Sequence, residues 1–126
     1  MRAVDTNVLV RLLTRDDAKQ VAAAEAFVSG GAWVPHLAIV EAAWVLASVY
    51  DRNHDQIAIA IEMLLAHDRL TLQDEEVVTA AVAQFRRRPK VDFSACLMLE
   101  VARKAGHVPL GTFDRELAKC DEAQRL

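Results

Sequence analysis

The stretch R-A-V-D-T-N-V-L-V-R-L-L at residues 2–13 decides the fold class of this chain. Its first three residues have the pattern of a short β-strand, which ends at the carboxylate of Asp5. Asp5, Thr6 and Asn7 are residue types that cap helix N-termini, so residues 8–13 are predicted to form a helix. A strand that leads directly into a capped helix is typical of an α/β fold.

The rest of the chain repeats this alternation of strands and helices. Further strands are expected at residues 32–35, 70–72 and 108–111. Helices are expected at residues 16–28, 36–50, 56–67, 74–88 and 92–104, with a last short helix from residue 114. The alternation predicts an α/β fold with a central, mainly parallel sheet of four to five short strands flanked by helices. The length of 126 residues fits a single domain.

The charge and the cysteine content restrict the functional class. The net charge of −3 argues against a protein whose main task is non-specific nucleic-acid binding, but it leaves room for a nuclease with a local basic patch. The two cysteines, Cys96 and Cys120, have no zinc-site spacing. The longest apolar stretch, residues 37–50, is too short to span a bilayer and contains Glu41. We therefore expect a cytoplasmic protein with no membrane segment.

Several carboxylates are expected near one edge of the sheet. Ligands of parallel sheets bind outside the carboxyl ends of the strands, where Asp5 ends the first strand and Asp114 follows the fourth. Glu41 lies in a helix that is apolar nearly all round, so its carboxylate is predicted to be buried. It then either lines the same crevice or is satisfied by Arg11 or by backbone donors. Asp92 and Asp114 have an alternative interpretation as helix N-caps.

Carboxylates in mutual contact favour a divalent cation. At a separation of ~4 Å and an effective dielectric constant of ~20, each like-charged pair costs about 4 kcal/mol. Hard oxygen ligands suit Mg²⁺ or Mn²⁺, and such ions activate water and stabilise phosphoryl transition states. Metal-dependent hydrolysis of a phosphodiester is the reaction class that follows.

Four segments of the sequence carry a family resemblance. They are V-D-T-N-V-L at residues 4–9, I-V-E-A-A-W-V-L at 39–46, V-D-F-S-A-C-L at 91–97 and G-T-F-D-R-E-L at 111–117. Their order and spacing resemble the signature segments of PIN-domain proteins and, more narrowly, of VapC-type toxins, the ribonuclease half of toxin–antitoxin pairs. The resemblance implies one three-layer PIN domain over residues 1–126.

The resemblance also implies a site and its partners. Asp5, Glu41, Asp92 and Asp114 would form the catalytic site, with Asp5, Asp92 and Asp114 as ligands of Mg²⁺ or Mn²⁺. Asn7 and Thr112 would be supporting polar groups. The function implied is metal-dependent endoribonuclease activity on RNA, restrained by a VapB-like antitoxin bound as a helix in an apolar groove. A homodimer built on the apolar N-terminal helices is implied as well.

One position departs from the family pattern. VapC-like chains usually carry an acidic residue three positions after the one that matches Asp92, and here that position is Ala95. Residues 92 and 95 share a helix face, so a carboxylate at 95 would serve the same site. We therefore expect an attenuated ribonuclease. The alternative is a catalytically silent PIN-fold module that binds an antitoxin and contributes to operon autorepression.

The basic run R-R-R-P-K at residues 86–90 has two interpretations. It can be a helix C-terminus, where cations are favoured by the helix dipole. It can also supply phosphate contacts for RNA near Asp92, because arginine binds phosphate in a bidentate manner.

Overall fold

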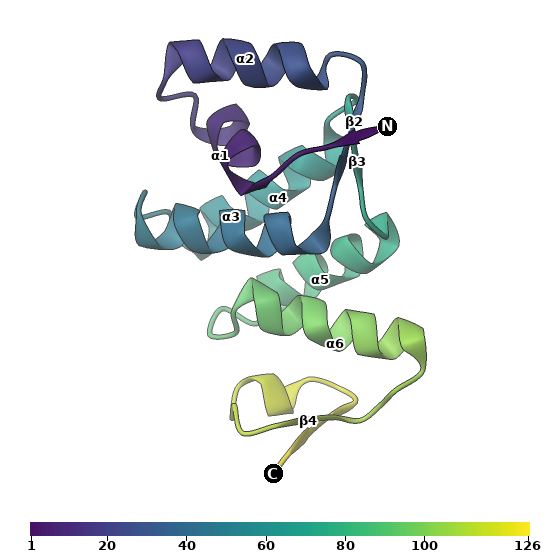
Figure 1. The fold of residues 1–126 in the computed structure, drawn as a ribbon. Helices are drawn as coiled ribbons and strands as arrows, with labels where there is room; N and C mark the ends of the chain where they lie inside the picture. The colour runs from purple at the N-terminus through teal and green to yellow at the C-terminus, as the bar shows by residue number, and fades with distance from the viewer. The chain divides into compact units, whose positions relative to one another are not determined.

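The computed structural model describes residues 1–126, which fold into two compact units (Figure 1). The first unit is Met1–Glu75 and the second is Glu76–Leu126. The chain contains six α-helices, one 3-10 helix and five strands, and every strand pair is parallel. The predicted α/β fold with parallel strands is confirmed. That the chain forms one domain stays a prediction.

The first unit contains a three-stranded parallel sheet in the order β1-β2-β3. Its strands are β1 (Arg2–Ala3), β2 (Ala32–Val34) and β3 (Leu70–Leu72). The register pairs Ala3 with Trp33 and Trp33 with Thr71. In β2 and β3 the outer two residues are buried and the middle one is exposed, which is the two-residue period of a strand. This sheet places the end of β1, and with it Asp5, beside the end of β2.

Four helices complete the first unit, drawn from purple to teal in Figure 1. They are α1 (Thr6–Thr14), α2 (Ala18–Val28), α3 (His36–Ser48) and α4 (His54–Ala66). Asp5, Asp17 and Asn53 cap α1, α2 and α4, each accepting a hydrogen bond from the backbone N–H three residues further on. Helix α1 packs against both α2 and α3, and α3 packs against α4.

The second unit holds two helices and a separate pair of strands. Its elements are α5 (Glu75–Arg87), which begins at the boundary, α6 (Phe93–Ala105), β4 (Leu110–Thr112), the 3-10 helix η1 (Leu117–Lys119) and β5 (Ala123–Arg125). β4 pairs only with β5, so the five strands form a sheet of three and a sheet of two. β4 begins one residue after Pro109, since a proline lacks the N–H that a strand interior needs. The helix expected from Asp114 is limited to η1.

The cores of the two units differ in composition. In the second unit Phe85 and Phe93 meet edge to face with ring centroids 5.9 Å apart, and Cys96 and Leu99 are fully buried nearby in α6. In the first unit the fully buried side chains are aliphatic, with Leu9, Ile39 and Ile61 among the largest. No helix of the structure is long and apolar enough to cross a membrane.

The prediction that the helix at residues 36–50 is buried all round is wrong. Its face at Leu37, Glu41, Trp44 and Ser48 is exposed, with Leu37 and Trp44 each 68% accessible. Steps of four, three and four residues place these side chains on one helix face, while Ile39, Ala42 and Leu46 lie in the core. The expected burial of Glu41 is therefore wrong too, because helix hydrophobicity does not report whether a neighbour covers that face.

Candidate functional site

Asp5 lies where β1 ends and α1 begins. Its backbone is extended, and its Oδ1 accepts a hydrogen bond of 3.3 Å from the N–H of Val8 in the first turn of α1. The side chain is exposed. A carboxylate has two oxygens with several lone-pair sites, so this cap orients Asp5 and leaves acceptor capacity for a ligand.

Glu41 is held by a hydroxyl group and not by a cation. Thr6, the first residue of α1, donates its Oγ1–H to Glu41 Oε1 over 3.1 Å. The expected alternative partner, Arg11, is engaged elsewhere with Asp16, Tyr50 and Gln20. The Thr6 contact thus joins the start of α1, next to Asp5, to the middle of α3. Sequence reasoning named Asn7 as a supporting group and missed Thr6, because no local pattern links residues 35 positions apart.

Asp92 occupies the N-cap position of α6 without using its side chain as a cap. Its backbone carbonyl accepts hydrogen bonds from Ala95 and Cys96, while its carboxylate is exposed and makes no cap hydrogen bond. The side chain of Asp92 therefore does not cap α6, contrary to the alternative interpretation of this residue as an N-cap. Ala95, half-buried in the first turn of α6, leaves the position three residues on without a carboxylate.

Both the carboxylate and the backbone N–H of Asp114 form hydrogen bonds within its turn. Its Oδ1 accepts from the N–H groups of Glu116 at 2.9 Å and Leu117 at 3.2 Å. Its own N–H donates to the hydroxyl of Thr112 over 3.0 Å. Asp114 does act as a turn cap, with Thr112 as the supporting group, and its exposed side chain keeps a second oxygen for other ligands.

The four predicted site residues divide evenly between the two units. Asp5 and Glu41 are linked through Thr6 in the first unit, and Asp92 and Asp114 belong to the second. None of the four makes an ion pair within its own unit. Exposed, cation-free carboxylates have the donor chemistry that Mg²⁺ and Mn²⁺ prefer. Neither unit alone gathers three or more His, Cys, Asp or Glu side chains that could hold a metal, so the ligand set Asp5, Asp92 and Asp114 stays a prediction.

Asp16 and Arg11 in the first unit and Cys96 in the second have shifted pKa values. The hydroxyl of Tyr50, helped by Thr14 and Arg11, lowers the pKa of Asp16 to about 2. Hydrogen bonds from the same cluster raise the pKa of Arg11. In the second unit, burial raises the pKa of the Cys96 thiol to about 12, which makes it an unreactive core residue. These shifts report structural contacts and do not identify an acid or base of the reaction.

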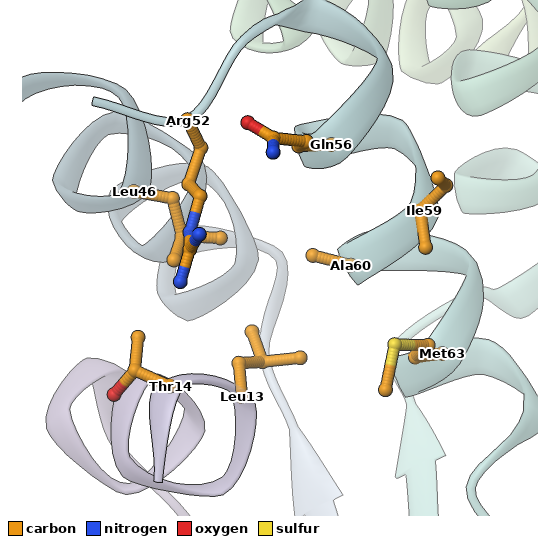
Figure 2. Close-up of a pocket in the computed structure, with 8 residues that line it drawn as sticks. All are labelled: Leu13, Thr14, Leu46, Arg52, Gln56, Ile59, Ala60 and Met63. Carbon is orange, nitrogen blue, oxygen red and sulfur yellow. The ribbon is translucent and has the colours of Figure 1, made fainter. Parts of the chain in front are cut away.

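A hollow of about 180 Å³ opens on the first unit (Figure 2). Figure 2 shows side chains of α1 and α4 on its opposite sides. The hollow is lined mainly by apolar groups: Leu13, Thr14, Leu46, Arg52, Gln56, Ile59, Ala60 and Met63. Ile59 and Met63 lie one turn apart on α4 and are both largely exposed. This is a surface that can accept apolar side chains of another molecule.

The basic run at residues 86–90 is in part structural. Arg86 and Arg87 lie in the last turn of α5, where the helix dipole favours cations. Arg87 donates to Gln84 Oε1 over 2.8 Å, and Arg88 donates to the backbone carbonyl of Lys119 over 3.0 Å. The helix C-terminus interpretation thus accounts for two of these arginines, and a phosphate contact by this run stays a prediction.

Comparison with known proteins identifies the family. The PIN domain profile matches residues 2–123, which is nearly the whole chain and crosses both units. Searches of curated proteins and of solved structures gave no significant match. The matched range contains Asp5, Glu41, Asp92 and Asp114 together with the segments around them. The chain therefore belongs to the PIN domain family.

Proposed function

We propose that this protein is a metal-dependent endoribonuclease and the VapC-type toxin of a toxin–antitoxin pair. The observation that carries the proposal is the PIN match over residues 2–123. That range includes the four segments on which the family resemblance rests, and each segment contains one of Asp5, Glu41, Asp92 and Asp114. All four are exposed and free of ion pairs within their units. PIN domains are typically metal-dependent nucleases, and this residue set suits that chemistry.

The reaction proposed is hydrolysis of an RNA phosphodiester. Mg²⁺ or Mn²⁺, when bound, supplies Lewis-acid stabilisation of the phosphoryl transition state and lowers the pKa of water. Asp5, Asp92 and Asp114 are the proposed ligands, and two of them are oriented by backbone N–H groups. Glu41 is the proposed residue that orients the attacking water. Its hydrogen bond from the neutral Thr6 hydroxyl fixes its position without a neutralising cation.

An antitoxin is the proposed protein partner. A toxic nuclease must be restrained, and an amphipathic helix laid into an apolar groove is a common mode of recognition. The hollow between α1 and α4, with exposed Ile59 and Met63, suits the apolar side chains of such a helix. A homodimer built on the apolar N-terminal helices is proposed as well.

A cleavage assay tests the catalytic part of the proposal. Defined tRNA, rRNA and mRNA fragments are incubated with the chain in Mn²⁺ or in chelator. We expect slow cleavage that requires the metal and that is lost in Asp5→Asn, since asparagine keeps the α1 cap and removes the charge. Asp17→Asn is the matched control, because Asp17 caps α2 in the same way outside the site. Equal activity of the two variants would contradict the assignment of Asp5.

Co-purification tests the partner. Expression with the neighbouring gene should recover a small second protein, and Met63→Asp should release it while leaving RNA cleavage intact. A chain that binds no protein encoded beside it speaks against the toxin assignment.

The second candidate is a silent PIN-fold module that binds the antitoxin and represses its own operon. Ala95 is the observation that favours it, because it removes a carboxylate that related chains usually carry. The two candidates differ in Mn²⁺ affinity and in RNA cleavage. Antitoxin binding without either property would favour the silent module.

A further inference from the structure

Phe113 stands out from the other phenylalanines of the chain. Its side chain is 80% exposed, whereas Phe85 and Phe93 are each 3% exposed in the core of the second unit. Phe27 is half-buried and lies under the Arg2 guanidinium, 3.8 Å from its ring centroid. An uncovered ring of this size forgoes the stabilisation of burial, and the fold of the second unit does not use it. The ring of Phe113 is therefore free to contact a ligand.

The backbone on either side of Phe113 is tightly held. Thr112 pairs with Arg125 in the β4–β5 sheet, and its carbonyl accepts the N–H of Leu126 over 2.9 Å. On the other side, Asp114 is tied to the Thr112 hydroxyl and to the N–H groups of Glu116 and Leu117. The ring is thus presented from a fixed backbone. Such a preorganised aromatic group loses little conformational entropy when it binds.

The two residues that follow Phe113 are charged and exposed. Asp114 is a proposed metal ligand, and Arg115 is exposed with no ion pair or side-chain hydrogen bond within its unit. The second unit carries 9 Lys or Arg against 7 Asp or Glu. Single-stranded nucleic acids are bound by aromatic rings that stack on bases and by arginines that contact phosphates. A protein helix would require a continuous apolar surface, but Thr112, Asp114 and Arg115 surround this ring along the chain.

We propose that Phe113 stacks on an unpaired RNA base next to the phosphodiester at Asp114, and that Arg115 contacts a backbone phosphate. The inference rests on the proposed ribonuclease function and adds a substrate-positioning residue to it. Stacking explains why the ring is exposed, since every base offers a flat face to it. It also places the base contact and the cleavage chemistry on adjacent residues of one rigid segment.

Equilibrium binding tests the stacking contact. The unmodified chain is titrated, in Ca²⁺, into a labelled 12-nucleotide oligoadenylate and into an abasic 12-mer with the same number of phosphates. Phe113→Ala should raise the Kd for oligoadenylate about 5- to 150-fold, the range expected for loss of one stacked base. Phe113→Trp should stay within a few-fold of the unmodified chain, while Phe113→Leu should be nearly as weak as Phe113→Ala. The matched control, Met98→Ala, removes a 59% exposed apolar side chain from α6 and should change neither Kd.

Two further measurements distinguish base stacking from other roles of Phe113. On the abasic 12-mer, Phe113→Ala should change the Kd by less than about twofold, because there is no base to stack on. The slope of log K against log salt should be unchanged by Phe113→Ala and reduced by about 0.7 by Arg115→Gln, the value for one phosphate contact on a single strand. A structural defect would instead weaken both oligomers and lower the melting temperature.

The outcomes that overturn the inference differ from those that overturn the proposed function. Unchanged oligoadenylate affinity in Phe113→Ala, or full rescue by leucine, removes the stacking role and leaves the nuclease proposal intact. A loss of antitoxin binding with normal RNA binding assigns Phe113 to the protein partner and overturns stacking. Failure of the unmodified chain and of Ala95→Asp to bind or cleave any RNA overturns both proposals.

Discussion

Residues 1–75 carry a net charge of −5, whereas residues 76–126 carry a net charge of +2. The acidic first unit holds Glu41 through one side-chain hydroxyl that comes from a different helix. The basic second unit holds Asp114 through backbone groups of its own turn. The comparison shows that the small net charge of the whole chain is the sum of two units of opposite net charge.

The two units also differ in how well they match the family pattern. In the first unit, both predicted carboxylates are present and each accepts a hydrogen bond that orients it. In the second unit, the side chain of Asp92 makes no cap hydrogen bond. The position three residues later, which is usually acidic in VapC-like chains, is Ala95. We infer that the weak point of the candidate site lies in the second unit, at the start of α6.

The largest expected effect comes from repairing that weak point. Ala95→Asp should raise metal-dependent RNA cleavage by about 10²- to 10³-fold, the usual effect of one contact that is stronger in the transition state. An acidic residue in the first turn of α6 also suits the helix dipole, so the fold should tolerate it. The measurement is single-turnover cleavage of one RNA in Mn²⁺ by the two proteins.

The control for this prediction is Asp92→Ala in the Ala95→Asp background, which should lower the rate again. If the unmodified chain already cleaves as fast as Ala95→Asp, a carboxylate at position 95 is dispensable. The candidate site then has no weak point in the second unit.

The next effect concerns the proposed binding of a divalent metal ion. A ligand that binds only the folded state stabilises it by about 2.7 kcal/mol at one hundred times its Kd, or roughly 10 °C for a chain of this size. Thermal melts in Mn²⁺ and in chelator should differ by this amount, and Asp5→Asn should abolish the difference. Asp17→Asn, which alters an equivalent cap, should preserve it. Identical melts in both buffers would remove the metal site from the proposal.

A smaller effect tests the link that is specific to the first unit. Thr6→Val keeps the shape of the side chain and removes the hydrogen bond to Glu41, so kcat should fall about tenfold in the Ala95→Asp background. KM should change little, because Thr6 acts on Glu41 and not on the RNA. Thr6→Ser restores the hydroxyl and should recover most of the rate. A rise in KM with unchanged kcat would assign Thr6 to RNA binding instead.

The elements that could be predicted from sequence are those with local signals. Residues 70–72 form the expected strand, and Asp5 caps α1 as its residue type predicts. The last strand, β5 at Ala123–Arg125, has no alternating pattern and exists because it pairs with β4. Its three residues are A-Q-R, which carry little strand preference of their own.

The candidate site also combines features that local sequence predicts with features that depend on tertiary packing. Asp5 and Asp114 each follow a strand, as expected. Their strands β1 and β4 belong to different sheets, so the expectation that both carboxylates lie at one edge of a single sheet stays a prediction. The environment of Glu41 could not be predicted, since its exposure depends on what covers the outer face of α3, and its bond to Thr6 depends on how α1 packs on α3. Local sequence reports the helix, whereas tertiary packing decides which of its faces meets solvent.

The smallest effect concerns acid stability in the first unit. Asp16 accepts hydrogen bonds from Tyr50 at 2.7 Å and Thr14 at 2.9 Å and pairs with Arg11 at 2.8 Å. These contacts tie the C-terminal end of α1 to the second residue after α3. Tyr50 is the largest cause of the fall in the pKa of Asp16 from its ordinary 3.8 to about 2. A folded-state pKa below the unfolded value stabilises the fold above about pH 4, and this contribution is lost as the pH falls through 2.

Tyr50→Phe removes that hydrogen bond and should lower the melting temperature by a few degrees at pH 7. The difference from the unmodified chain should narrow as the pH falls from 4 through 2, because Asp16 becomes protonated in both proteins and the charged acceptor is lost. Hydrogen exchange can locate the effect, with faster exchange expected at the C-terminal end of α1 and none in α6. A difference in melting temperature that stays constant between pH 7 and pH 2 would mean that Tyr50 stabilises the first unit through packing alone. Asp16 would then add no pH-dependent stability to the acidic half of the molecule.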